Sequence, residues 1–371
     1  MILARIFTRI YKEGGIILID ATGKKYICGN PRKENPITVK LLKANLNWKL
    51  LVDPELEFPE AYMRNDIVIE NASLKEFLMD LIKNLGRREV STASAIAKRI
   101  YQLCRYLTNF NFPSKSKKNI EHHYDIGGER GEKLYDIFLD TKHRLYSCAY
   151  WKENTKTLEE AQQNKIDHIV KKLDIKDGQK VLEIGCGWGG MAFEIAKQKK
   201  CEVTGISLSK NQIKYCKEKA KELSLDNQVK FELIDYREAK GHYDRIYSVG
   251  MFEHVGKKFY NTFFKSINNL LKNDGLFLLH TIGVVDSPTP PNKFINKYIF
   301  PGGVCPSFSQ IITPIEKTGL IVSDTETLIR HYDKTLESWL QRFMDQKNVV
   351  KELFDEKFVK MWEFYMASCA A

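Results

Sequence analysis

The chain has 371 residues, enough for about two domains with separate hydrophobic cores. Hydrophobic residues make up 43% of it and charged residues 28%, which excludes collagen-like, low-complexity and wholly disordered proteins. The 58 lysines and arginines exceed the 47 acidic residues, and the resulting net charge of +11 favours a polyanionic partner, either nucleic acid or an anionic membrane surface.

Targeting and metal-binding signals are missing from the sequence. No stretch approaches the roughly 18 consecutive apolar residues of a membrane span, and Arg5 and Arg9 interrupt the apolar core that a signal peptide requires. The eight cysteines form no C-x-x-C pair, which argues against a zinc ribbon, a redox dithiol or a disulfide scaffold. We therefore expect a protein of the reducing cytoplasm without a metal site.

Residues 1–85 are predicted to form a small α+β module. Apolar residues between Ile2 and Tyr11 recur at helical spacing, which indicates an amphipathic helix packed on its own domain or lying on a membrane surface. Two β-rich runs predict a hairpin over residues 15–30. Residues 66–69 are predicted as a strand and 74–85 as a helix.

A helix over 93–107 and an exposed basic linker with Lys115, Lys117 and Lys118 are expected to follow. The domain boundary is placed at this linker. The first domain then covers residues 1–112 and the second residues 119–371.

From residue 157 onward helices and strands alternate. The expected helices end near 173 and cover 190–199 and 210–223, while the expected strands cover 180–184, 202–206, 229–234 and 243–249. Such alternation predicts a doubly wound parallel sheet of the Rossmann-like type, with ligands beyond the carboxyl ends of its strands.

A glycine-rich turn indicates a nucleotide site. The strand 180–184 ends at Gly185, Gly187 and Gly189, and a helix follows, which is the context in which such a string binds phosphate or nucleoside groups. No acidic residue stands at the end of the next strand, about 20 residues on, where a dinucleotide-binding fold places one for the ribose. NAD is therefore disfavoured.

The residues around this turn resemble the S-adenosylmethionine pocket of class I methyltransferases. In that resemblance the glycine turn contacts the methionine portion, Ser207 and Gln212 lie near the ribose, and Asp235 lies near the adenine. The alternative for Asp235 is a helix N-cap. The residues assigned to the cofactor are Tyr146, Ser147, Glu183, Gly185, Gly187, Gly189, Ser207, Leu208, Gln212, Asp235, Tyr236 and Arg237.

Further motifs resemble the cyclopropane fatty acid synthases, within the family that also includes the mycolic acid cyclopropane synthases. The motifs are HYDIG (123–127), YSCAYW (146–151), GMFEHVG (250–256), LHTIG (279–283), YIFPGG (298–303) and HYDKTL (331–336). The resemblance implies a class I methyltransferase α/β fold with a small N-terminal α+β domain. It also implies methylene transfer from S-adenosylmethionine to the cis double bond of unsaturated phospholipid acyl chains.

Methyl transfer to an alkene leaves a positive charge on carbon, so the site should be dry and rich in aromatic rings. The aromatic candidates are Tyr146, Tyr150, Trp151, Tyr298, Phe300, Phe308 and Tyr332. In the family a bound bicarbonate ion removes the proton. The resemblance implies that Cys148, Glu253, His280, the backbone of Ile282 and Tyr332 hold it, and Cys369 matches a family cysteine that has been assigned to the active site.

The substrate implies docking on an anionic membrane, with Arg5, Arg9, Lys12 and the linker lysines as basic candidates. The resemblance also implies a homodimer and a cytoplasmic protein held peripherally at the inner membrane. Residues 284–300 are a candidate mobile cover over the acyl channel.

Three other functions remain open. The first is a fatty-acyl C-methyltransferase that yields a methyl branch, and the second is a non-catalytic lipid-binding protein. The third is a nucleic-acid methyltransferase, which is disfavoured because residues 247–253 replace its Pro-Pro-Tyr type motif, so no nucleic-acid partner is expected.

Overall fold

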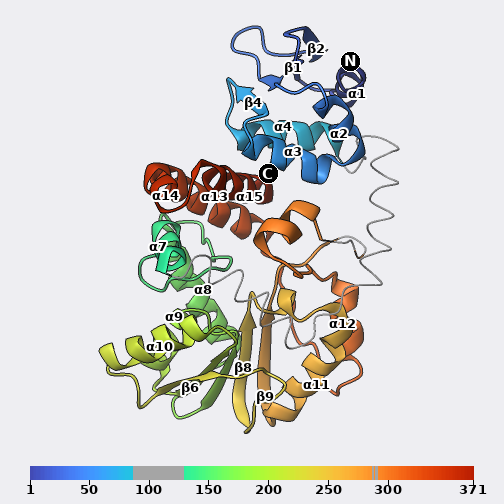
Figure 1. The fold of residues 1–371 in the computed structure, drawn as a ribbon. Helices are drawn as coiled ribbons and strands as arrows, with labels where there is room; N and C mark the ends of the chain where they lie inside the picture. Colours follow the sequence, from blue (N-terminus) through green and yellow to red (C-terminus); the bar gives the residue numbers. More distant parts are fainter. Residues whose placement is uncertain (87–128, 286–287, 289–290) are drawn as a thin grey trace. The chain divides into compact units, whose positions relative to one another are not determined.

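The computed structural model describes residues 1–86, 129–285, 288 and 291–371, and the chain forms two compact units (Figure 1). The first unit comprises Met1–Thr108, Asn292–Ile299 and Trp339–Ala371. The second comprises Asn109–Pro291 and Phe300–Ser338. The expected helix 93–107, the linker lysines and the motif at 123–127 lie outside the described residues.

The first unit contains a four-stranded sheet in the order β2-β1-β3-β4. Its elements are α1 (Ile2–Ile10), β1 (Gly15–Ile19), β2 (Lys25–Gly29), β3 (Thr38–Leu41), α2 (Leu46–Val52), α3 (Pro54–Met63), β4 (Ile67–Glu70) and α4 (Leu74–Leu85). The predicted hairpin is confirmed, because β1 pairs antiparallel with β2. The predicted helix at 74–85 is also confirmed, and Ser73 begins it with a capping box to Glu76.

Two C-terminal segments belong to the first unit, although the sequence placed them in a domain over 119–371. They contain η3 (Ile295–Ile299), α14 (Lys347–Leu353) and α15 (Glu356–Ala370). The Phe364 ring of α15 lies 5.8 Å from Phe58 of α3 and 5.0 Å from Phe294. Tyr62 also donates a 2.9 Å hydrogen bond to Glu363. Because of these long-range contacts, the two units cannot be separated by a single boundary in the sequence.

The second unit is built on a parallel five-stranded sheet in the order β7-β6-β5-β8-β9. The strands are β5 (Lys180–Ile184), β6 (Glu202–Ser207), β7 (Val229–Leu233), β8 (Tyr243–Val249) and β9 (Leu271–His280). Chain order reverses between β6 and β8, the two neighbours of β5, which places a ligand crevice at the carboxyl end of β5. The predicted doubly wound sheet is confirmed.

Helices cover both faces of this sheet (Figure 1). α8 (Leu158–Lys172), α9 (Gly190–Lys199) and α10 (Lys210–Glu222) pack on one face, and α11 (Tyr260–Leu270) packs on the other. Along β5, Val181 joins the first core while Leu182 and Ile184 join the second, as the two-residue period of a strand requires. The other elements are α7 (Glu129–Phe138), η1 (Phe252–His254), η2 (Lys257–Phe259), α12 (Phe308–Ile315) and α13 (Ile329–Asp345).

Candidate active site

The turn between β5 and α9 depends on glycine for close packing. Gly189 has a φ of +79°, and a Cβ there would lie 2.9 Å from the Phe193 ring. At Gly190, the first residue of α9, a Cβ would lie 1.9 Å from the carbonyl oxygen of His143. The glycines thus let α9 approach the backbone of the segment that carries Tyr146 and Ser147.

A cavity of about 1070 Å³, part of it open to solvent, lies at the carboxyl end of β5. Every residue that the sequence assigned to the cofactor lines it except Gly189, which packs into the core instead. Residues that the sequence analysis did not assign to the cofactor also line the cavity, among them Arg144, Trp188, Met251 and His254. The Arg144 guanidinium lies 4.1 Å from the centre of the Trp188 ring.

The residues assigned to the nucleoside lie at or just beyond the carboxyl ends of the neighbouring strands β6 and β7. Ser207 Oγ donates to Gln212 Oε1 over 2.9 Å. Asp235 accepts a backbone hydrogen bond from Arg237 and binds its guanidinium through Nε at 2.6 Å and Nη2 at 2.5 Å. The N-cap alternative for Asp235 is wrong, because residues 236–238 form a turn and not a helix.

Glu183 of β5 also lines the cavity and is buried. Its Oε2 has no hydrogen-bond partner within the described part of the chain. Burial raises the pKa of this carboxyl to about 8, and the nearby Tyr247 and Lys165 oppose the increase. Glu183 is thus a buried acid facing a cavity that the sequence assigned to a cationic cofactor.

Lys165 of α8 is a buried residue of the site that the sequence analysis missed. Its Nζ donates a 2.6 Å hydrogen bond to Ser147 Oγ. Burial lowers the pKa of this lysine to about 8, opposed by Asp140, Cys148 and Glu183. The available signal was a lysine on the apolar stripe of the helix, beside Ile166.

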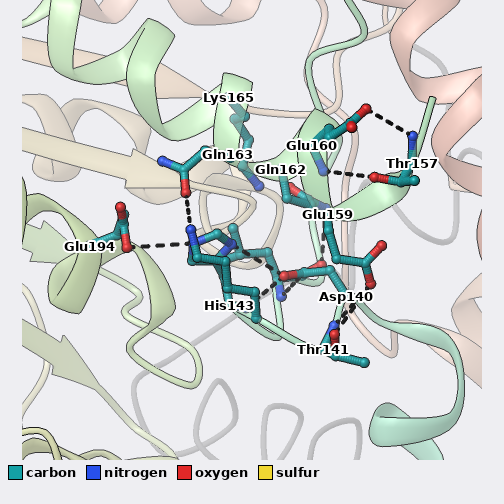
Figure 2. Close-up of polar contacts among 12 residues, drawn as sticks. Asp140, Thr141, His143, Thr157, Glu159, Glu160, Gln162, Gln163, Lys165 and Glu194 are labelled. Carbon is teal, nitrogen blue, oxygen red and sulfur yellow. Dashed lines mark hydrogen bonds and ion pairs between the residues drawn. The ribbon is translucent and has the colours of Figure 1, made fainter. Parts of the chain in front are cut away.

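Other polar contacts fix the backbone before Cys148. Gln162 donates to the carbonyl oxygens of Leu145 and Ser147, at 3.3 and 3.0 Å. Asp140 accepts from the backbone N–H groups of His143 and Leu145, at 2.6 and 2.8 Å. Figure 2 shows the His143 ring between Asp140 and Glu194. The loop that carries Tyr146 and Ser147 is therefore held by buried polar groups.

Glu253 and His280 lie at the ends of neighbouring strands. Glu253 follows β8 in η1, His280 is the last residue of β9, and β8 pairs with β9 through Val249 and His280. Glu253 Oε1 accepts the backbone N–H of Ile282 at 2.6 Å. Glu253 Oε2 and His280 Nδ1 are buried and lack a partner among the residues described. The Ile282 N–H, expected as a donor to an anion, is thus already engaged by Glu253.

Burial shifts the pKa values of both groups. Burial raises the pKa of Glu253, and the Ile282 N–H opposes the increase. Burial lowers the pKa of His280 to about 4, and the positive charge of Lys165 acts in the same direction. The imidazole is therefore neutral at pH 7, and His254 is neutral for the same reason, since burial lowers its pKa to about 4.

The remaining candidates lie in three places. Cys148 is buried, and burial raises the pKa of its thiol to about 11, so it is a neutral S–H group. Tyr332 is half-buried in the first turn of α13. Cys369 is exposed on α15 in the first unit, whereas the other five candidates belong to the second.

The aromatic candidates also lie in different parts of the structure. Tyr146 lines the cavity and packs against Tyr135, Phe138 and Phe300, with ring centres 5.4 to 6.4 Å apart. Phe308 is 58% exposed, so its assignment to a dry pocket is wrong. Tyr298 belongs to the first unit and donates to Glu60.

Comparisons with known proteins agree with this geometry. Residues 113–371 match the model of the mycolic acid cyclopropane synthetase family. The cyclopropane-fatty-acyl-phospholipid synthase of Escherichia coli K12 is 40% identical over 263 residues, 70% of this chain and 66% of that protein. A probable fatty acid methyltransferase of Pseudomonas putida is 36% identical over 258 residues, 68% of this chain and 64% of that protein. The matched region thus spans less than two thirds of either relative.

A solved structure of mycolic acid cyclopropane synthase CmaA1, complexed with SAH and CTAB, has a TM-score of 0.64 and 31% identity to this chain. The match covers 68% of this chain and 92% of that one. The parallel sheet, the glycine turn and the cavity beside it define an S-adenosylmethionine-dependent methyltransferase of class I. Within that class, the chain belongs to the mycolic acid cyclopropane synthetase family.

Proposed function

We propose that this methyltransferase is a cyclopropane-fatty-acyl-phospholipid synthase, which converts the cis double bond of an unsaturated acyl chain into a cyclopropane ring. The observation that carries the proposal is the buried Glu253 carboxyl. It is fixed by the Ile282 N–H at 2.6 Å and keeps its second oxygen without a partner in the described chain. Met251 and His254, which lie before and after Glu253 in the sequence, line the cofactor cavity.

S-adenosylmethionine bound in the cavity would supply an electrophilic methyl group. Around that position the chain places Tyr146, packed on Phe300, and the neutral His254. Aromatic faces stabilise positive charge on the acyl carbon without attacking it, and a neutral imidazole adds no repulsive charge. A carboxylate in free contact with the carbocation would trap it, whereas burial raises the pKa of the Glu253 carboxyl and so disfavours its ionised form.

We propose bicarbonate as the base, held by Cys148, Glu253, His280 and Tyr332. The residues fit such an anion, because burial has left Glu253 Oε2 and His280 Nδ1 without partners while keeping the Cys148 thiol protonated. Bicarbonate bound there would take up the proton that the new methyl group loses. Ile282 then orients Glu253, since its N–H is committed to that carboxyl. Cys369 has no part in the proposal.

We further propose that the first unit docks on an anionic membrane surface. Four large apolar side chains on or next to α1, β3 and α2 are exposed. The exposed fraction is 43% at Ile2 and 62% at Trp48, and the fractions for Leu42 and Val52 lie between these two values. α1 and α2 are linked by the bond from the Leu3 N–H to Asn47. The exposed Arg5, Arg9 and Lys12 supply positive charge beside this patch. No helix in the described part of the chain has the length and apolar character needed to span a membrane.

The test is direct. The purified chain is incubated with S-adenosylmethionine, bicarbonate and vesicles of unsaturated phosphatidylglycerol, and the acyl chains are analysed by mass spectrometry and by proton NMR of the olefinic region. The proposal predicts the gain of one CH2 per acyl chain with loss of the olefin, and slower turnover after dissolved carbon dioxide is removed. Full activity without bicarbonate would reject the proposed base, and no change in acyl mass would reject the function.

A second candidate is a fatty-acyl C-methyltransferase, favoured by the similarity to the Pseudomonas putida relative. Its product would gain the same mass but keep an olefin, so the NMR spectrum separates the two functions. The proposed homodimer is tested separately by sedimentation velocity.

A further inference from the structure

Three aromatic rings stack beside the proposed site. The ring of Tyr150 lies between His168 of α8, at 4.3 Å and 15°, and His331 of α13, at 4.6 Å and 10°. Neither histidine lines the cofactor cavity. The stack therefore lies outside the lining of the cofactor cavity.

Hydrogen bonds join the same elements. The backbone N–H of Trp151 donates to His331 Nδ1 at 2.8 Å. The backbone N–H of Ala149 and the indole Nε1–H of Trp151 donate to Thr335 Oγ1, at 3.1 and 3.0 Å. Thr335 Oγ1 in turn donates to the carbonyl oxygen of His331 at 2.7 Å. We call this set of contacts the His331 clasp.

Two residues of the clasp are sequence neighbours of residues in the proposed site. Cys148 directly precedes Ala149, and Tyr332 directly follows His331. Residues 149–151 and α13 are about 180 positions apart in sequence, so the clasp determines how these two segments lie against each other. Cys148 and Tyr332 are therefore each one residue away from a member of the clasp.

The bond from Trp151 depends on the protonation of His331. Nδ1 accepts a hydrogen bond, so it carries no proton while the bond exists. Burial lowers the pKa of His331, Glu326 opposes this change, and Lys334 and His168 reinforce it. Glu326 is itself bound by Tyr150, His168 and Lys172. The bond from the Trp151 N–H to His331 Nδ1 is therefore present at neutral pH and is lost when the ring is protonated, at a pH below the ordinary histidine range, whereas the bonds to Thr335 do not titrate.

We propose that His331 is a positioning residue. In its neutral form it holds residues 149–151 on α13 and keeps Cys148 and Tyr332 in the arrangement that turnover requires, and its protonation in acid breaks the Trp151 bond and weakens the clasp. This inference rests on the proposed function, because it assumes that both residues act in the site.

Two variants at His331 distinguish its role as a hydrogen-bond acceptor from its change of protonation with pH. His331→Asn places an amide oxygen near Nδ1 that accepts at every pH, whereas His331→Ala removes the acceptor. We expect about a tenfold loss of kcat for His331→Ala at pH 7.5, the effect of one buried hydrogen bond. We expect His331→Asn to recover most of that loss and to keep its activity in the acid range where protonation of His331 lowers the activity of the wild-type enzyme. His168→Asn is the matched control, since His168 stacks on Tyr150 but receives no bond from residues 149–151.

Hydrogen exchange gives a readout that does not depend on activity. Protection of the Trp151 amide, corrected for intrinsic exchange, should fall in the wild type as the pH is lowered from 7.5 through the titration of His331, and it should stay constant in His331→Asn. Equal pH dependence in both proteins would overturn the clasp, and so would an unchanged acid limb of the kcat profile in His331→Asn. If the wild type forms no cyclopropane product, the proposed function fails, while the exchange experiment still decides whether the clasp titrates.

Discussion

Glu183 should release a proton when the cofactor binds. The carboxyl is buried, Oε2 has no partner among the described residues, and burial raises its pKa to about 8. At pH 7 roughly nine tenths of the free protein therefore carries the proton. S-adenosylmethionine brings a sulfonium and an ammonium group into the cavity that Glu183 lines, and positive charge favours the carboxylate.

The size of the effect follows from the pKa. Ionising a group with a pKa of about 8 costs about 1.4 kcal/mol at pH 7, so each unit of pH below 8 should weaken binding about tenfold. The dissociation constant therefore falls as the pH rises from 6 to 8 and levels off above 8.

Calorimetry with S-adenosylmethionine, titrated in the absence of lipid, measures the proton directly. At pH 7 the binding enthalpy is compared in buffers of different ionisation enthalpy, and the slope gives the number of protons released. The ammonium of the ligand titrates with either protein, so the difference between the wild type and Glu183→Gln isolates the carboxyl. Lys165 also has a pKa of about 8, and Lys165→Met measures its share. Identical slopes for the wild type and Glu183→Gln would refute the reasoning.

Four further outcomes are expected. Glu253→Gln should lower kcat about 100-fold in the vesicle assay while calorimetry shows unchanged cofactor affinity, because the variant affects the site of proton removal and not the cavity; unchanged turnover would exclude this role. Lys165→Met should weaken cofactor binding about tenfold, since Ser147 Oγ loses its 2.6 Å partner, and wild-type affinity would contradict this. Gly190→Ala should lower the free energy of unfolding in urea by about 2 kcal/mol, because its Cβ would meet the His143 carbonyl; a neutral result would show that the turn adjusts. Raising the salt concentration should weaken sedimentation of the protein with anionic vesicles, and Trp48→Ala should weaken it at any salt concentration. If neither change altered sedimentation, the proposed docking surface would be rejected.

Local patterns in the sequence were sufficient for much of the fold. The strand at 180–184, the helix at 190–199 and the strand at 243–249 end where the structure has them. Their period and their glycine boundaries depend on neighbours a few residues away, so the sequence records them directly. The same holds for most of the cofactor cavity, because parallel strands bring their carboxyl ends to one edge of the sheet.

Contacts between distant segments came only from the tertiary structure. The sequence showed a lysine at 165 and a glutamate at 253, but only the packing of α8 placed the lysine on Ser147, and only the pairing of β8 with β9 brought the glutamate to the Ile282 N–H. The assignment of 339–371 to the first unit and the bond between Trp151 and His331 are of the same kind. Such contacts depend on the order of the strands and on which helix faces are buried together. No local period encodes these features, so the sequence by itself determined the elements and the cofactor turn, and the tertiary structure decided which buried polar groups meet.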